Sequence, residues 1–285
     1  MIILKDSEAL HNLMNKLQQQ STAIGFVPTM GALHQGHASL VKVSKQANDF
    51  TLVSVFVNPT QFDKAEDLAQ YPRLEQQDIE LLEKNGADAV FFPSVEDIYP
   101  DGEKSEHFDF NGIEHQMEGK FRPGHFDGVG TVVKRFFEMV QPTRAYFGEK
   151  DFQQLAIIRH LVESLNIPVE IVSVPIKREA DGLAMSSRNL RLTQEMREEA
   201  PKIYAILLAA KAFLKTHSIE ATHQFVKEAF DKTQLVLEYF EIADEATLVS
   251  VQTQEKGQRI RAFVAVFAGD IRLIDNLDLN ESKGL

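Results

Sequence analysis

Short apolar segments that alternate with amphipathic segments are the feature that most restricts the fold of this chain. Segments 23–27, 50–57 and 87–92 are apolar, and the second is rich in β-branched residues, so each has the character of a buried strand. Segments of helical character, such as 6–20 and 72–84, lie before or between them. Strands that alternate with helices in this way form a parallel sheet with crossover helices, so we expect an α/β fold.

The alternation continues to about residue 175 and then changes. Up to that point we expect helices over 128–140 and 151–165, and strands over 144–148 and 169–174. Beyond it we expect a helix capped by Thr193 and broken or kinked at Pro201, a helix over 219–233, and strands over 236–243, 261–268 and 270–275. The last two strands are separated only by Gly269. This pattern predicts two domains. The first is residues 1–175, and the second, residues 176–285, is a smaller α+β domain that carries an antiparallel hairpin.

The segment Pro28-Thr29-Met30-Gly31-Ala32-Leu33-His34-Gln35-Gly36-His37 connects a predicted strand to a predicted helix. The first backbone N–H groups of a helix have no internal partners and favour an anion. Gly31 and Gly36 allow the main chain to approach a ligand closely. His34 and His37 are three residues apart and share one face if the helix begins there. We therefore favour a phosphate-binding turn over a metal site, which has no cysteine or nearby acidic third ligand, and over two surface histidines.

Two further polar motifs each have a structural and a functional interpretation. The segment 58–61 either ends a strand as a turn or fixes a small polar substrate through the amide of Gln61. The segment 121–129 combines a cation, a histidine and glycines, and its structural interpretation is a helix start capped by Asp127. Ligands of parallel sheets lie beyond the carboxyl ends of the strands. Met30 and Gln61 both follow predicted strands, so we expect them to face one pocket.

Charged residues mark two later junctions. After the strand at 144–148, Lys150 is placed to act as a point charge toward phosphate, and Asp151 either caps the next helix or helps to hold a hydrated magnesium ion. Gln154 follows inside that helix. The segment 178–189 is either a polar linker or a second phosphate clamp, in which hydroxyl groups act with Arg188.

Composition excludes several classes of function. The chain has no cysteine, so it has neither disulfides nor thiolate metal sites, which suits a cytoplasmic protein. Its formal net charge of −12 argues against nonspecific binding to nucleic acid, which depends on an excess of Lys and Arg. No apolar run has the length of a membrane span, and the N-terminus lacks the pattern of a signal peptide. We expect a cytoplasmic protein that binds neither nucleic acid nor membrane.

Six motifs in a fixed order resemble those of the pantothenate synthetase (pantoate–β-alanine ligase) family over essentially the whole chain. They are 28–37, Phe56-Val57-Asn58-Pro59-Thr60-Gln61-Phe62, Glu66-Asp67-Leu68 with Tyr71-Pro72-Arg73, Gly124-His125-Phe126-Asp127-Gly128-Val129, Phe147-Gly148-Glu149-Lys150-Asp151-Phe152-Gln153-Gln154, and Asp181-Gly182-Leu183-Ala184-Met185-Ser186-Ser187-Arg188-Asn189. The His-x-Gly-His element alone also occurs in class I aminoacyl-tRNA synthetases and nucleotidylyltransferases. The order of all six is far more specific.

The resemblance implies a Rossmann-like parallel sheet flanked by helices, a smaller C-terminal α+β lid domain, and a homodimer. It also implies a two-step reaction with ATP and Mg²⁺. The pantoate carboxylate attacks the α-phosphorus of ATP and gives pantoyl adenylate and pyrophosphate. The amine of β-alanine then attacks the acyl carbon and gives pantothenate and AMP. Positioning and charge neutralisation dominate such a displacement at phosphorus.

By position, the family's functional residues fall on the motifs quoted above. His37 would be the general acid that supports the departing pyrophosphate, and His34 and Lys150 would neutralise charge. Gln61 and Gln154 would hold pantoate, with Gln61 also bordering the β-alanine site, and no residue is assigned as a direct metal ligand. The ATP contacts would be Met30, Gly31, Ala32, Leu33, His34, Gln35, Gly36, His37, Gly148, Glu149, Lys150, Asp151, Lys177 (through its backbone), Met185, Ser186, Ser187 and Arg188.

Two other functions remain open from the residues alone. A nucleotidylyltransferase would need cations for a phosphorylated acceptor, whereas this chain places Gln61 and Gln154 there. A nucleotide-sensing module without activity would have lost a phosphate-handling residue. The chain keeps all four, His34, His37, Lys150 and Arg188. The chain also departs from the family at Asp63, where a glycine is usual, and at Leu74, where a threonine is usual, and we expect at most altered loop packing.

Overall fold

The computed structural model describes residues 1–62 and 65–280. Within these ranges the chain forms two compact units. The first unit comprises residues 1–149 and 154–176. The second comprises residues 150–153 and 177–285, of which the structure describes those up to residue 280. The departure from the family at Asp63 lies outside the described residues.

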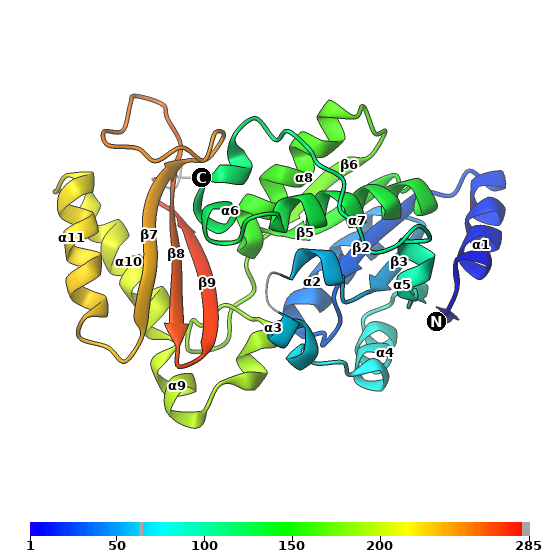
Figure 1. Ribbon diagram of the computed structural model, residues 1–285, viewed down its shortest axis with the longest axis horizontal. Coiled ribbons are helices and arrows are strands. Elements are labelled where there is room, and N and C mark those ends of the chain that lie inside the picture. The colour runs from blue at the N-terminus through cyan, green and yellow to red at the C-terminus, as the bar shows by residue number, and fades with distance from the viewer. Residues whose placement is uncertain (63–64, 281–285) are drawn as a thin grey trace. The chain divides into compact units, whose positions relative to one another are not determined.

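A parallel sheet is the centre of the first unit (Figure 1). Among the described residues it has six strands in the order β1-β4-β3-β2-β5-β6, and every neighbouring pair is parallel. The strands are β1 (Ile2–Leu4), β2 (Ile24–Thr29), β3 (Phe50–Val55), β4 (Ala89–Phe91), β5 (Arg144–Gly148) and β6 (Glu170–Val174). The predicted α/β fold is confirmed.

Helices cover both faces of this sheet, which is why its central strands are apolar on both sides. The longer helices are α1 (Ser7–Gln19), α2 (Gln35–Ala47), α4 (Glu75–Lys84), α7 (His125–Val140) and α8 (Phe152–Ser164). Shorter elements are α3 (Ala65–Gln70), α5 (Val95–Ile98), α6 (Met117–Phe121), η1 (Pro59–Gln61), η2 (Ile113–His115) and η3 (Glu149–Asp151). On β2, Val27 packs in a cluster with Leu40 of α2 and Leu82 of α4, whereas Phe26 contacts Phe136 of α7. Successive strand residues thus serve opposite layers.

Several element boundaries differ from the sequence-based expectations. Strand β1 was not expected, because three residues at a sheet edge carry almost no pattern, and two of them, Ile2 and Ile3, are largely exposed. Helix α4 begins at Glu75 rather than at Pro72. Helix α7 begins at His125, and its N-cap is Gly124 in a left-handed conformation (φ +79°) rather than Asp127. Asp127 instead accepts the backbone N–H of Phe108.

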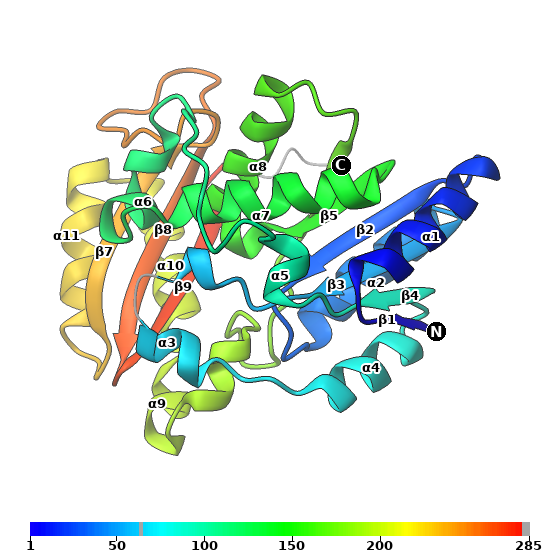
Figure 2. The same cartoon turned by 45° about the vertical axis from the view of Figure 1, so that its right-hand side comes forward.

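The second unit contains a three-stranded antiparallel sheet, as far as residue 280 (Figure 2). Its strands are β7 (Val236–Asp244), β8 (Ile260–Ala268) and β9 (Ile271–Asp278), and its helices are α9 (Gln194–Glu199), α10 (Lys202–Leu214) and α11 (Ile219–Phe230), with η4 (Ser187–Arg191) before them. Alternate β8 residues from Ile260 to Ala268 join the core that α10 and α11 supply. Thr193 caps α9, and Pro201 separates α9 from α10. The predicted α+β character of this region is confirmed.

Candidate functional site

A buried carboxylate holds the turn between β2 and α2. Asp78 of α4 accepts the backbone N–H groups of Ala32 (Oδ2, 3.0 Å) and Leu33 (Oδ1, 2.6 Å). The turn has unusual backbone geometry, with φ of +81° at Gly31 and +48° at Ala32. Burial raises the pKa of Asp78, and the two backbone hydrogen bonds partly oppose that shift. These bonds fix the turn in the shape that starts α2.

The two histidines of this turn form the cap of α2. His34 is the N-cap residue, and its Nδ1 accepts the N–H of Gly36 at 3.1 Å. His37 is the third helical residue, and its Nδ1 accepts the N–H of His34 at 3.2 Å. A backbone amide always donates, so both Nδ1 atoms lack a proton in these bonds. Each neutral ring therefore carries its proton on Nε2, and the ring centroids lie 4.1 Å apart.

A polar cluster follows β3 in the same unit. The Nε2 atom of Gln61 lies 2.7 Å from Sδ of Met30, which confirms that the ends of β2 and β3 bring these two residues together. Asn58 donates from Nδ2 to Gln61 Oε1 at 3.2 Å, and Tyr99 donates from its hydroxyl to Asn58 Oδ1 at 2.6 Å. Burial raises the pKa of Tyr99, so the hydroxyl keeps its proton near neutral pH.

Helix α7 approaches this cluster closely. A Cβ added at Gly128 would lie 2.4 Å from the carbonyl oxygen of Thr60 and 2.9 Å from Cα of Gln61. The ring of His125 donates from Nδ1 to the carbonyl oxygen of Gln61 at 2.8 Å, and Arg122 donates to the same oxygen at 3.1 Å. The motif around Gly124 thus serves to position Gln61.

The Gln61 cluster also contains Asn58, Tyr99, Arg122 and His125, to which the sequence patterns assign no role. The signal for three of them was present, because Asn58 belongs to one quoted motif and Arg122 and His125 lie in the segment 121–129. Tyr99 carried no local signal. Its contact with Asn58 joins residues 41 positions apart, which no local pattern shows.

The remaining predicted residues lie at two places in the chain. Gly148 ends β5, Lys150 lies in η3 with its Nζ 3.3 Å from Asp151 Oδ1, and Gln154 is half-buried in the first turn of α8. In the second unit, the N–H of Met185 donates to the carbonyl oxygen of Lys177 at 3.0 Å, which places these two residues side by side.

The segment after Met185 is a short capped turn. Ser186 is the N-cap of η4, and its Oγ accepts the N–H of Arg188 at 3.3 Å. Ser187 is buried. Lys150 and Asp151 belong to the same unit as this segment, whereas the two histidines belong to the other unit.

The described residues contain neither a metal-binding cluster nor a membrane-spanning helix. No group of three or more His, Asp or Glu side chains within residues 1–62 and 65–280 is arranged to hold a metal ion. In the same ranges, no helix combines the length and apolar character needed to cross a membrane.

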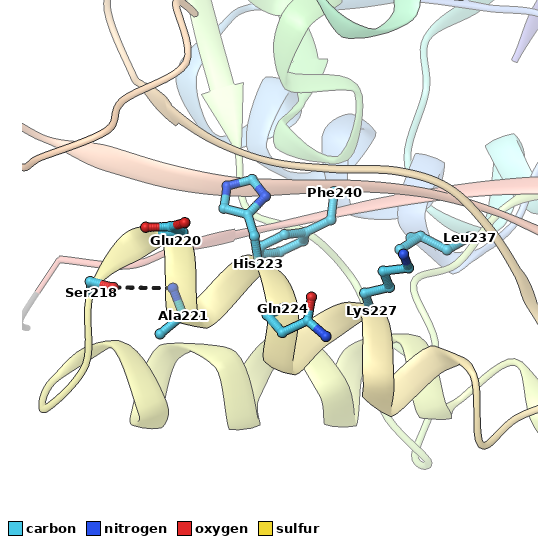
Figure 3. Close-up of a pocket in the computed structure, with 8 residues that line it drawn as sticks. All are labelled: Ser218, Glu220, Ala221, His223, Gln224, Lys227, Leu237 and Phe240. Carbon is cyan, nitrogen blue, oxygen red and sulfur yellow. Dashed lines mark hydrogen bonds between the residues drawn. The ribbon is translucent and has the colours of Figure 1, made fainter.

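The second unit also has a surface pocket of about 640 Å³ between α11 and β7 (Figure 3). His223, Lys227 and Phe240 are among the residues that line it, and the ring of His223 meets Phe240 edge to face at 5.1 Å. None of the predicted site residues lines this pocket.

Comparison with known proteins decides the family. The chain matches the pantoate–β-alanine ligase family over residues 2–278. It belongs to that family. It is 52% identical to a pantothenate synthetase of Christiangramia forsetii over 98% of this chain and 100% of that protein. As a family member, the chain is a ligase that joins pantoate to β-alanine with ATP.

Solved structures agree with this assignment. A pantothenate synthetase from Thermus thermophilus superposes with a TM-score of 0.91 at 41% identity, over 99% of this chain and 100% of that one. A pantoate–β-alanine ligase from Francisella tularensis, complexed with β-γ ATP and β-alanine, gives 0.81 at 38% identity over 99% of both chains.

Proposed function

We propose that the histidine turn that begins α2 is the phosphate-handling centre of a two-step ligation through pantoyl adenylate. The observation that carries this proposal is the reciprocal cap, in which His34 and His37 both use Nδ1 to accept backbone N–H groups. Each ring then has Nε2–H as its donor for phosphate oxygens. The dipole of α2 adds to this, because the helix N-terminus favours negative charge.

The chemistry of the first step needs charge stabilisation more than a covalent protein group. The pantoate carboxylate attacks the α-phosphorus, and the bond to the bridging oxygen of pyrophosphate breaks. His37 stabilises the charge that develops on pyrophosphate by a hydrogen bond from Nε2–H. His34 and Lys150 help to neutralise the same charge. A fully protonated ring would direct Nδ1–H at the N–H of His34, so donation by the neutral ring fits this cap better than release of a proton.

For pantoate we propose Gln61 and Gln154, with Gln61 also bordering β-alanine. Support comes from the way Gln61 is held, since its side chain bonds Asn58 and its carbonyl oxygen accepts from His125 and Arg122. A side chain fixed in this manner loses little conformational entropy when it binds a small polar substrate. In the second step, the β-alanine amine attacks the acyl carbon and AMP leaves.

For ATP we propose the residues that the resemblance implies. They are Met30 to His37, Gly148 to Asp151, Lys177, and Met185 to Arg188. Lys150 and Arg188 supply positive charge for the phosphates. The short turn at Ser186 supports this role, since it directs consecutive backbone and hydroxyl groups to one small region.

Mg²⁺ is part of the proposal as a companion of ATP. An ion that arrives on the phosphates keeps several waters and needs only one or two protein carboxylates, so the absence of a three-ligand cluster among residues 1–62 and 65–280 is compatible with it. Asp151, whose side chain is 47% exposed beside Lys150, is the carboxylate that fits. When bound, the ion would neutralise phosphate charge. We also propose a cytoplasmic homodimer that binds neither nucleic acid nor membrane.

The reaction can be followed by incubating the protein with ATP, Mg²⁺ and pantoate and measuring pyrophosphate and AMP, with and without β-alanine. We expect pyrophosphate release to depend on pantoate, and release of free AMP with pantothenate to require β-alanine as well. AMP release that is independent of both acids would rule out the ligase mechanism.

A further inference from the structure

Lys150 is attached to the second unit although its chain neighbours on both sides belong to the first. Residues 150–153 cluster with residues 177–285, whereas Glu149 and Gln154 belong to the first unit. The attachment is a hydrogen bond from Nδ2 of Asn276, on β9, to the carbonyl oxygen of Lys150 at 2.9 Å. Asn276 is 1% exposed, so its side-chain amide is shielded from water.

Arg261 of β8 fixes the orientation of that amide. Its guanidinium donates to Oδ1 of Asn276 at 2.8 Å, which leaves Nδ2 as the atom that faces Lys150. The same guanidinium lies 4.1 Å from the ring centre of Phe152, two residues after Lys150, and Phe152 meets Phe263 edge to face. Arg261 and Phe263 are two positions apart on β8 and share one face of the sheet.

The residue before Asn276 serves the other face. Asp275 pairs with Val264 in the sheet, and Val264 belongs to the core packed by α10 and α11. Its carboxylate accepts two hydrogen bonds from Arg178, at 2.6 and 2.9 Å, and the Arg178 guanidinium stacks 3.7 Å from the ring centre of Tyr204. Both charged partners are largely buried, so this bidentate pair is a rigid link.

Arg178 also contacts the residues just before the proposed phosphate-binding residues Met185 to Arg188. It donates to the carbonyl oxygen of Gly182 at 3.2 Å and pairs as a β-bridge with Ala184, the residue before Met185. Strand β9 also contacts η4, which contains Ser187 and Arg188. Two segments that are far apart in sequence, residues 150–153 and 177–188, are therefore held by adjacent residues of one strand.

We propose that Asn276 is a positioning residue of the ligation, which fixes Lys150 to β9 and so sets its distance from the clamp residues Ser186 to Arg188. This inference rests on the proposed role of Lys150 at the phosphates. A lysine ammonium is a point charge on a flexible stem, so its placement depends on the backbone that carries it. In this role Asn276 acts on the reaction through the backbone of Lys150.

Asn276→Ala tests the proposal, with Asn280→Ala as the matched control. Asn280 follows β9 and also donates its amide to a backbone oxygen, that of Ile260, but it does not contact Lys150. For Asn276→Ala we expect kcat/KM for ATP in pyrophosphate release to fall about tenfold, since small misplacement of a charged group is costly. The control should change it by less than about twofold. Melting temperatures of both variants show whether they remain folded.

A double-mutant cycle with Lys150→Ala separates positioning from general destabilisation. If Asn276 acts through Lys150, the double variant has the activity of Lys150→Ala alone. Additive losses would overturn the inference, and so would an unchanged rate in Asn276→Ala. If Lys150→Ala itself has the wild-type rate, the proposed role of Lys150 fails first and this inference fails with it. A slow Lys150→Ala beside a normal Asn276→Ala refutes the positioning role alone.

Discussion

The Nδ1 atom of His37 accepts the backbone N–H of His34 at 3.2 Å, so the start of α2 determines which nitrogen of the His37 ring is protonated. The same bond links two properties that are usually measured separately. It caps a helix, and it presents Nε2–H as the donor of a residue proposed to act on phosphate. Removal of His37 should therefore change both stability and rate, and by very different amounts.

For His37→Ala we expect the rate of pyrophosphate release to fall by roughly 10²–10³, the range typical of a lost hydrogen-bond donor to charge that develops in the transition state. The loss of a cap should lower the free energy of unfolding by only about 1 kcal/mol. Steady-state kinetics and denaturant unfolding measure the two effects. His11→Ala, at an exposed position of α1, is the control and should change neither. If His37→Ala loses stability but keeps the wild-type rate, His37 caps the helix and has no role in the reaction.

Asp78→Ala should weaken ATP binding from a distance. It removes the acceptor of the Ala32 and Leu33 N–H groups, and a buried unsatisfied amide costs about 1–3 kcal/mol. We expect KM for ATP to rise about tenfold because the turn loses its shape. Glu75→Ala, on an exposed part of the same helix, is the control. Equal kinetics in the two variants would show that the turn does not need Asp78.

The pH dependence of the free energy of unfolding gives an independent test of the pKa shift of Asp78. Burial raises its pKa in the folded protein above the ordinary value of 3.8. The stability that Asp78 contributes because of this raised pKa is complete below the pKa that Asp78 has in the unfolded chain. It is lost as pH rises through the pKa that Asp78 has in the folded protein. The stability of the wild type relative to Asp78→Ala should therefore decrease as pH is raised from about 4 toward neutrality. Urea unfolding of both proteins across this range measures it, and a difference that grows with pH would contradict the shift.

Gly128→Ala should act on pantoate. The added methyl group would lie 2.4 Å from the carbonyl oxygen of Thr60, so α7 and the turn that carries Gln61 must separate. Overpacking of this kind typically costs about 1–3 kcal/mol of stability. We expect KM for pantoate to rise about tenfold while KM for ATP changes little. Glu138→Ala, exposed on the same helix, is the comparison. A wild-type KM for pantoate in a folded Gly128→Ala would separate α7 from substrate binding.

The sequence alone determined the layers of this protein. Strands buried between two helical layers are mostly apolar along their length, so β2 and β3 can be predicted without any structure. The change of pattern after residue 175 likewise predicted the α+β character that β7 to β9 show. The histidine turn was also visible, because glycines and imidazoles between a strand and a helix form a local pattern.

The residues that hold that turn and its partners are set by tertiary contacts, which no local sequence pattern shows. Asp78 is indistinguishable in sequence from other charged residues of an amphipathic helix, and its role depends on the N–H groups of Ala32 and Leu33, 46 and 45 positions away. Asn276 reaches Lys150 across 126 positions. Local periodicity reports the layer in which a residue lies, whereas these contacts depend on the register of strands and on buried hydrogen bonds. Their physical cause is long-range packing, which a sequence pattern does not encode locally.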